Sequence, residues 1–192
     1  MLSSKIIFEI LKEKGNDISY IDSREVIFTK YHNNNEVVDE EKTGINISNN
    51  LNLIESKIVI MPGFIATDSN NEISNLGRGG SDYTASIMAN YTNSKALEIW
   101  TDVSGVFSAN PKIVKNAKPI DSLSYKEAME LSFFGAKVIY FPTLQPLVEK
   151  NIPAYIKNTF DQNANGTCIS CLLYTSDAAD DTPCVDLGGR RI

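Results

Sequence analysis

The residues best suited to bind a charged ligand lie in one short stretch, Gly-Arg-Gly-Gly-Ser-Asp at positions 77–82. Its three glycines run directly into a segment of helical character. Glycines let backbone N–H groups turn inward, and a helix start adds unpaired N–H groups with partial positive charge, so this junction suits an anion. Arg78 can direct two donors at a carboxylate, whereas Asp82, one turn away, would attract an ammonium group. We therefore predict a binding loop for a zwitterion such as an amino acid.

The same stretch also has a simpler interpretation, as an ordinary helix start with Ser81 or Asp82 as the N-cap and Arg78 in solvent. Two familiar glycine motifs do not match it. The dinucleotide fingerprint requires a glycine at the position of Asp82, and the phosphate-loop motif requires a Gly-Lys-Ser/Thr sequence that the chain lacks. Because His32 is the only histidine, no histidine-centred catalytic pair can form, and we assign no metal-ligating residues.

The composition favours a globular protein with a small ligand. The chain has 192 residues, of which 42% are hydrophobic, which suits one domain or one domain and a fragment. Eighteen basic and 24 acidic residues give a net charge of -6, which argues against nucleic acid or an anionic membrane as the partner. The first residues lack a signal-peptide pattern, and the longest apolar run, at 58–66, is too short to cross a bilayer. We therefore expect a cytoplasmic protein.

The C-terminal end has a different character. All three cysteines, Cys168, Cys171 and Cys184, lie there, and the first two have the C-x-x-C spacing of metal and redox sites. We reject that interpretation because residues 171–192 resemble a translated sequencing adaptor, and such segments have to be left out of fold reasoning. We expect these residues to form an artefactual, disordered tail.

Strands and helices are predicted to alternate along the rest of the chain. A helix at 3–14 has an apolar face that we expect in the core, the strand at 57–61 is expected to be buried, and residues 31–50 are expected to form a mobile loop. Further strands are predicted at 17–22, 25–30, 96–100 and 152–158, and further helices after the glycine stretch, at 124–134 and at 143–150. This alternation predicts a parallel sheet covered on both faces, with ligands beyond the carboxyl ends of its strands. Thr101 and Asp102 stand at such an end.

Residues 76–86 resemble the Gly-Arg-Gly-Gly-Ser-Asp-Tyr-Thr-Ala segment of aspartate kinases, which have the amino-acid kinase fold. The resemblance continues through Trp-Thr-Asp-Val-Ser-Gly-Val at 100–106, Met-Glu-Leu-Ser-Phe-Phe-Gly-Ala-Lys-Val at 129–138 and residues 152–159, so it covers most of 1–170. It implies an α/β fold, a three-layer α/β/α sandwich with a largely parallel central sheet that is incomplete at the N-terminus. It also implies that 1–160 are the C-terminal half of a catalytic domain, and that 161–170 are a stub leading to a missing regulatory region.

The resemblance implies roles for individual residues. Aspartate would be bound by Arg78, Ser81 and Asp82, and the catalytic residues would be Lys137 and Asp102. Nucleotide-binding positions would be Gly63, Phe64, Gly79, Gly80, Thr101, Asp102, Phe107, Lys112 and Lys137. The chain departs from many relatives at some positions: Phe107 and Lys112 stand where tyrosine and arginine occur, and Tyr140-Phe141 replaces a His-Pro pair.

The activity implied is transfer of the ATP γ-phosphoryl group, with Mg²⁺ as cofactor, to the side-chain carboxylate of L-aspartate. The product would be 4-phospho-L-aspartate, in the first step of lysine, threonine and methionine biosynthesis. The acceptor is already ionised at neutral pH, so positioning and charge neutralisation can suffice without a catalytic histidine. We expect a parent enzyme that forms homo-oligomers through its regulatory domains, and whether that parent is fused to homoserine dehydrogenase stays open.

Two motifs of aspartate kinases do not occur in the chain, the phosphate-holding Lys-Phe-Gly-Gly-Thr-Ser loop and a Phe-Gly-Glu that helps to bind aspartate. We therefore expect this polypeptide alone to show no kinase turnover. Two alternatives remain open. One is another amino-acid kinase, of the glutamate or uridylate type, and the other is a non-catalytic module that binds a nucleotide or an amino acid.

Overall fold

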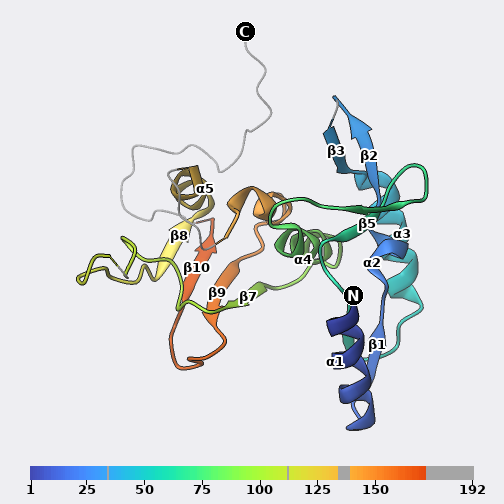
Figure 1. The fold of residues 1–192 in the computed structure, drawn as a ribbon, viewed down its shortest axis with the longest axis horizontal. Helices are drawn as coiled ribbons and strands as arrows, with labels where there is room; N and C mark the ends of the chain where they lie inside the picture. The colour runs from blue at the N-terminus through green and yellow to red at the C-terminus, as the bar shows by residue number, and fades with distance from the viewer. Residues whose placement is uncertain (34, 112, 134–138, 172–192) are drawn as a thin grey trace.

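The computed structural model describes residues 1–33, 35–111, 113–133 and 139–171, and they fold around two hydrophobic cores (Figure 1). One core lies under a four-stranded sheet with the strand order β7-β9-β10-β8. The strands are β7 (Leu97–Thr101), β9 (Ala154–Asn158), β10 (Thr167–Ser170) and β8 (Ser122–Ser124). Strands β7 and β9 are parallel, β9 and β10 are antiparallel, and β10 and β8 are parallel. The prediction of an α/β fold with parallel strands is confirmed.

Three helices pack on one face of this sheet and close the first core. They are α4 (Gly80–Tyr91), α5 (Tyr125–Phe133) and α6 (Gln145–Val148), and the short 3-10 helix η1 (Phe141–Leu144) leads into α6. Strand residues Ile156 and Ile169 point into this core and are fully buried. The alternate strand positions lie on the opposite face, where Trp100 is 47% exposed. Among the described residues, helices therefore cover one face of this sheet.

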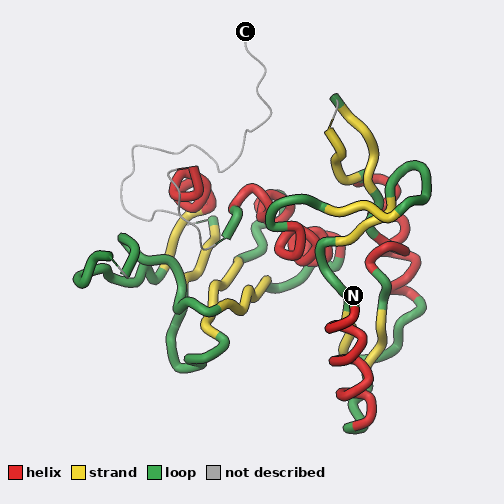
Figure 2. The backbone as a smooth tube through the Cα atoms, in the orientation of Figure 1, coloured by secondary structure: helices red, strands yellow, loops and turns green. Residues whose placement is uncertain are grey.

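The second core is built from the first half of the chain. The first half of the chain contains α1 (Leu2–Glu13), the parallel pair β1 (Ile18–Tyr20) and β4 (Ile58–Ile60), α2 (Ser23–Val26), the hairpin β2 (Thr29–His32) and β3 (Asn35–Val38), α3 (Glu40–Asn52), and the hairpin β5 (Ile65–Thr67) and β6 (Ile73–Asn75). The side chains of the second core come from α2, β3, α3, β5 and α4 and from residues that follow β1, β4 and β6, whereas α1 has no buried residue. Helix α4 lies between the two cores (Figure 2). Ala89 belongs to the first core and Ile87 to the second. Both halves of the structure therefore position the helix that follows the glycine stretch.

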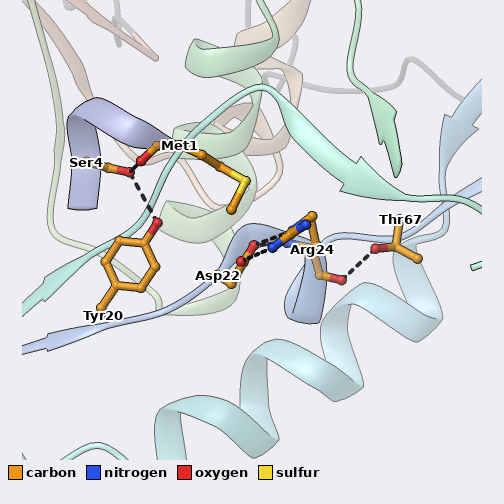
Figure 3. A network of polar contacts seen from close by, with 6 residues as sticks. All are labelled: Met1, Ser4, Tyr20, Asp22, Arg24 and Thr67. Atoms are coloured by element: carbon orange, nitrogen blue, oxygen red, sulfur yellow. Dashed lines mark hydrogen bonds and ion pairs between the residues drawn. The ribbon is translucent and has the colours of Figure 1, made fainter. Parts of the chain in front are cut away.

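The predicted strand at 25–30 is only partly correct, because a helical turn occupies its first residues. Asp22 caps this turn, α2, by accepting a hydrogen bond from the backbone N–H of Arg24 at 3.1 Å. The same carboxylate forms an ion pair with the Arg24 guanidinium at 2.6 Å, and this hydrogen bonding lowers the pKa of Asp22 (Figure 3). The strand begins only at Thr29.

The prediction of a mobile loop at 31–50 is wrong. Residues 35–38 are paired with β2, and α3 begins directly afterwards. Asp39 is the N-cap of α3, and Glu40 and Glu41 occupy the first turn, where carboxylates interact favourably with the helix dipole. The acidic run is therefore a helix start. Ile47 and Thr43 anchor the helix in the second core with no exposed surface.

Two elements expected in the core are half exposed instead. The apolar face of α1 contains Ile6, Ile7 and Ile10, which are 50%, 51% and 47% exposed. In β4, Ile58 is 45% exposed. The reason is that β1 and β4 form a sheet of only two strands, and α1 contacts mainly β1. Ser4 is hydrogen-bonded to the Tyr20 hydroxyl (Figure 3), and the Phe8 ring packs edge-on against the Tyr20 ring.

Part of the segment expected to be a stub, 161–170, is an internal strand of the four-stranded sheet. Thr167, at the start of β10, is fully buried. Its hydroxyl accepts a hydrogen bond from the Val106 N–H at 2.8 Å and donates one to the Ile120 carbonyl at 2.6 Å. The Thr167 hydroxyl therefore connects Val106 and Ile120, which lie near the two ends of the segment between β7 and β8.

Replacing Thr167 by valine should lower the free energy of unfolding by about 2–4 kcal/mol, because the buried Val106 N–H and the partly buried Ile120 carbonyl both lose this partner. Thr167→Ser keeps the hydroxyl, so it should cost clearly less. Urea unfolding of both variants checks this expectation. A larger loss in Thr167→Ser than in Thr167→Val would show that the methyl group, rather than the two hydrogen bonds, is what stabilises the fold.

No helix in the described ranges has the length and the apolar character needed to cross a membrane.

Candidate functional site

The glycine stretch forms a tight turn between β6 and α4. Gly77 and Gly79 both adopt the left-handed region, with φ of 68° and 70°. The Gly77 N–H donates to Asn75 Oδ1 at 3.0 Å, and the Gly80 N–H donates to the Gly77 carbonyl at 3.1 Å. The helix starts at Gly80 with Gly79 as the N-cap, and no side chain caps it. The alternative in which Ser81 or Asp82 caps the helix is therefore wrong, and the first turn of α4 keeps backbone donors for a ligand.

A second predicted segment, Gly63 and Phe64, lies directly against this helix start. A Cβ on Gly63 would come within 2.9 Å of the Ser81 Cα, and one on Gly80 within 2.8 Å of Phe64 Cδ2. The Phe64 N–H donates to Thr84 Oγ1 at 3.0 Å. Phe64 has φ of 78°, which is unfavourable for a residue with a side chain and is held here by these contacts. The structure thus brings together Gly63, Phe64, Gly79, Gly80 and Ser81.

The two charged residues of the stretch have different environments. Arg78 is exposed, and its guanidinium carbon lies 5.1 Å from the centre of the Tyr140 ring. Asp82 is half-buried on the first turn of α4, and this burial raises the pKa of its carboxyl group. The ion pairs found among the described residues involve neither side chain. The site therefore offers a cation and a partly desolvated carboxylate, both available to a ligand.

The raised pKa of Asp82 has a consequence for stability. Between its ordinary pKa of 3.8 and the raised value, the folded state holds more protons than the unfolded state, so stability falls as pH rises through this window. At pH values above this window, Asp82 is ionised in both states, and the full cost of burying its charge lowers the free energy of unfolding. Asp82→Asn should therefore increase the free energy of unfolding at pH 7, with the gain disappearing at pH values below 3.8.

Urea unfolding at pH 7 and at pH 3 checks this expectation, with Glu130→Gln on the exposed side of α5 as a control that should change little. The same Asp82→Asn variant should weaken an ammonium-bearing ligand. A variant that is both less stable and unchanged in ligand binding would contradict the role given to Asp82.

The predicted nucleotide residues at the end of β7 form a separate group. The Thr101 carbonyl accepts a hydrogen bond from the Thr159 N–H at 2.8 Å, and the Thr101 hydroxyl donates to Asp102 Oδ1 at 3.2 Å. Asp102 is exposed, as expected at the carboxyl end of a strand. Phe107 is half-buried and forms an isolated bridge with Pro119. Thr101 pairs with Asn158 at the end of β9 and is hydrogen-bonded to Thr159, which follows that strand. Lys112 and Lys137 lie outside the described residues.

Sequence reasoning missed one segment that contacts the glycine stretch. A Cβ on Gly79 would lie 2.9 Å from Thr143 Cγ2 and 3.0 Å from Tyr140 Cβ. Thr143 is 4% exposed, and both its N–H and its hydroxyl donate to the Tyr140 carbonyl, at 3.0 Å and 2.6 Å. The local sequence predicts a helix here, but the contact joins residues more than 60 positions apart, so no local pattern could reveal it.

Comparison with known proteins shows which family the chain belongs to. A model described as "Amino acid kinase family" matches residues 1–158. The chain belongs to the amino acid kinase family. A bifunctional aspartokinase/homoserine dehydrogenase of Buchnera aphidicola is 40% identical over 172 residues, which are 88% of this chain and 21% of that protein. The lysine-sensitive aspartokinase 3 of Escherichia coli is 34% identical over 88% of this chain and 38% of that protein.

Solved structures of the amino acid kinase family support the same fold. E. coli aspartokinase III, in a complex with aspartate and ADP, matches with a TM-score of 0.80 and 33% identity, over 88% of this chain and 38% of that one. Aspartate kinase of Clostridium acetobutylicum matches with a TM-score of 0.72 and 38% identity, over 84% of this chain and 36% of that one. The predicted fold class is thereby confirmed. The chain spans about a fifth to two-fifths of the length of these relatives.

Proposed function

We propose that this chain supplies the aspartate-binding loop and part of the nucleotide-binding region of an ATP-dependent aspartate kinase. One observation carries the proposal. The first turn of α4 has no side-chain cap and is flanked by two opposite charges, Arg78 and Asp82, neither of which has an ion-pair partner among the described residues. That charge pattern matches the α-carboxylate and the ammonium group of an amino acid.

In this proposal, Arg78 and the backbone donors at the start of α4 bind the α-carboxylate of L-aspartate. The half-buried Asp82 binds the ammonium group, which removes part of the cost of its own desolvation. Ser81 lies at the same helix start, packed against Gly63, and offers a hydroxyl to the substrate. These contacts fix the orientation of the substrate and leave its side-chain carboxylate free as the acceptor of the phosphoryl group.

We assign the nucleotide to the carboxyl end of β7, where Thr101 and Asp102 lie, and to Phe107 in the segment that follows. We also assign Lys137 to the phosphates and Lys112 to the nucleotide, as the family resemblance implies. Mg²⁺ would neutralise phosphate charge. Such an ion would be bound mainly by phosphate oxygens and water, with Asp102 as the nearest proposed carboxylate. A cytoplasmic location and a homo-oligomeric parent enzyme belong to the same proposal.

Direct binding measurements test this proposal. We expect L-aspartate to bind the chain more tightly than L-glutamate, D-aspartate or UMP in titration calorimetry, and MgADP to bind without displacing aspartate. Tighter binding of UMP or glutamate than of aspartate would contradict the assignment and favour another amino-acid kinase activity.

Turnover is a second and separate readout. Hydroxylamine converts an acyl phosphate to a hydroxamate, so incubation with aspartate, MgATP and hydroxylamine reports any phosphoryl transfer to a carboxylate. We expect this polypeptide alone to bind both substrates and to form no hydroxamate, because its sequence lacks the Lys-Phe-Gly-Gly-Thr-Ser and Phe-Gly-Glu motifs. Hydroxamate formation well above a control without aspartate would contradict that expectation.

A further inference from the structure

The contact between Arg78 and Tyr140 carries an inference about the substrate site. Arg78 follows a left-handed glycine, has an exposed side chain and belongs to a turn whose only other charged residue is Asp82. A long, exposed arginine side chain normally keeps most of its rotamer freedom, and fixing it on a ligand costs free energy. The ring of Tyr140, 5.1 Å from the guanidinium carbon, restricts this freedom before any ligand arrives.

Tyr140 itself is held in place through its backbone. Thr143, nearly fully buried, donates two hydrogen bonds to the Tyr140 carbonyl, and the Cα of Gly79 packs against both residues. Tyr140 is 38% exposed, and its ring lies beside the turn as a platform for Arg78. A Cβ on Gly79 would come within 3.0 Å of Tyr140 Cβ and 2.9 Å of Thr143 Cγ2, so any side chain at this position would displace the platform.

The geometry leaves the hydrogen-bonding edges of the guanidinium free. A cation held over an aromatic face is attracted by the ring quadrupole, and this attraction does not consume N–H donors. The hydrogen bonds and ion pairs found among the described residues involve no Arg78 side-chain donor. Ring contact and carboxylate binding can therefore occur at the same time.

We propose that Tyr140 is a positioning residue, whose ring holds the Arg78 guanidinium ready to receive the α-carboxylate of the amino-acid substrate. This inference rests on the proposed function, which assigns that carboxylate to Arg78. Tyr140 does not touch the reacting atoms. Its effect is on the affinity for the substrate carboxylate, through the order it imposes on Arg78.

The side-chain Nε–Hε signals of arginine in ¹H–¹⁵N NMR spectra test the contact without a ligand. The chain has only four arginines, Arg24, Arg78, Arg190 and Arg191, so the Arg78 signal can be assigned from its loss in Arg78→Lys. Protons above an aromatic face are shifted upfield. The Arg78 signal should therefore lie upfield in the wild type and in Tyr140→Phe, and move to the random-coil position in Tyr140→Leu. The Arg24 signal should stay in place, because that side chain pairs with Asp22.

Aspartate titrations of the same samples test the consequence. Tyr140→Leu should weaken L-aspartate by roughly three- to thirty-fold, the range expected for loss of a cation–π contact, whereas Tyr140→Phe should bind like the wild type. Tyr31→Leu, at a tyrosine 77% exposed on β2, serves as the matched control and should change neither readout. Far-UV circular dichroism of each variant confirms that it is folded.

Three outcomes would overturn the inference, and they can be told apart. An Arg78 signal that does not move in Tyr140→Leu would show that the contact is absent in solution. A signal that moves while aspartate affinity stays equal would show that the contact does not position Arg78 for the substrate. A wild type that binds no aspartate would overturn the proposed function and this inference with it, even with the ring contact intact.

Discussion

Replacing Arg78 by alanine should weaken L-aspartate binding by roughly ten- to a hundred-fold or more, the effect expected from losing charge-assisted hydrogen bonds worth about 1.5–3 kcal/mol. Arg78→Lys keeps the charge and loses the paired donors, so its affinity should lie between those of the wild type and the alanine variant. Because Arg78 is exposed and forms no ion pair among the described residues, neither substitution should change the free energy of unfolding much.

Titration calorimetry with L-aspartate and with MgADP measures both affinities on the same variants. Arg24→Lys is the matched control, since this arginine pairs with Asp22 away from the glycine turn. We expect MgADP affinity to be unchanged in all of them. If the Arg78 variants weakened MgADP and spared aspartate, the loop would be a phosphate cradle, and the assignment of a zwitterion to it would be wrong.

Gly79→Ala should lower the free energy of unfolding by about 2–5 kcal/mol, whereas Gly77→Ala should cost only about 1–2 kcal/mol. The two glycines have nearly the same left-handed φ, 70° and 68°, so the backbone strain added by a Cβ is the same. Their surroundings differ. A Cβ on Gly77 meets nothing within 4 Å, while a Cβ on Gly79 would collide with Thr143 and Tyr140.

Urea unfolding of Gly77→Ala and Gly79→Ala separates backbone strain from steric overlap, because Gly77→Ala reports the backbone strain alone. Gly79→Ala should also weaken aspartate, since it displaces the segment against which Arg78 lies. Equal losses of stability in the two variants would mean that the segment at 140–143 can move away without cost, and that it does not support the turn.

Local patterns in the sequence were enough to predict the elements around the site. The glycine turn and α4 follow from backbone freedom and helical spacing, and β7 and β9 follow from short apolar runs. The helix predicted at 124–134 begins with a capping box, a pattern of adjacent residues: the Ser124 N–H donates to Glu127 Oε2 at 2.8 Å, and the Glu127 N–H donates to Ser124 Oγ at 3.1 Å. Each of these signals lies within a few residues of the structure that it predicts.

The predictions that failed have a common physical cause. The structure at these positions depends on contacts with residues that are far away in the sequence. Helix α3 is poor in apolar residues, and its stability rests on a cap at Asp39 and on the burial of Thr43 and Ile47 in the second core. The Tyr140 platform and the Thr167 anchor likewise depend on residues 61 positions away, Gly79 and Val106. Burial of α1 was overestimated for the same reason, because an amphipathic pattern shows which face can be buried and says nothing of what covers it.

The central claim is that Arg78 binds the α-carboxylate and Asp82 the ammonium group of one amino acid. The most direct test measures each variant with a ligand that lacks the group which the replaced side chain is proposed to bind. Succinate lacks the ammonium group of aspartate, and 3-aminopropanoate lacks its α-carboxylate. Dissociation constants of the three ligands for the wild type, Arg78→Ala and Asp82→Asn, measured by calorimetry, form two closed cycles. We predict that Arg78→Ala weakens aspartate and succinate but not 3-aminopropanoate, and that Asp82→Asn weakens aspartate and 3-aminopropanoate but not succinate. Equal weakening of all three ligands by each variant would show that neither side chain recognises its assigned group, and would contradict the account.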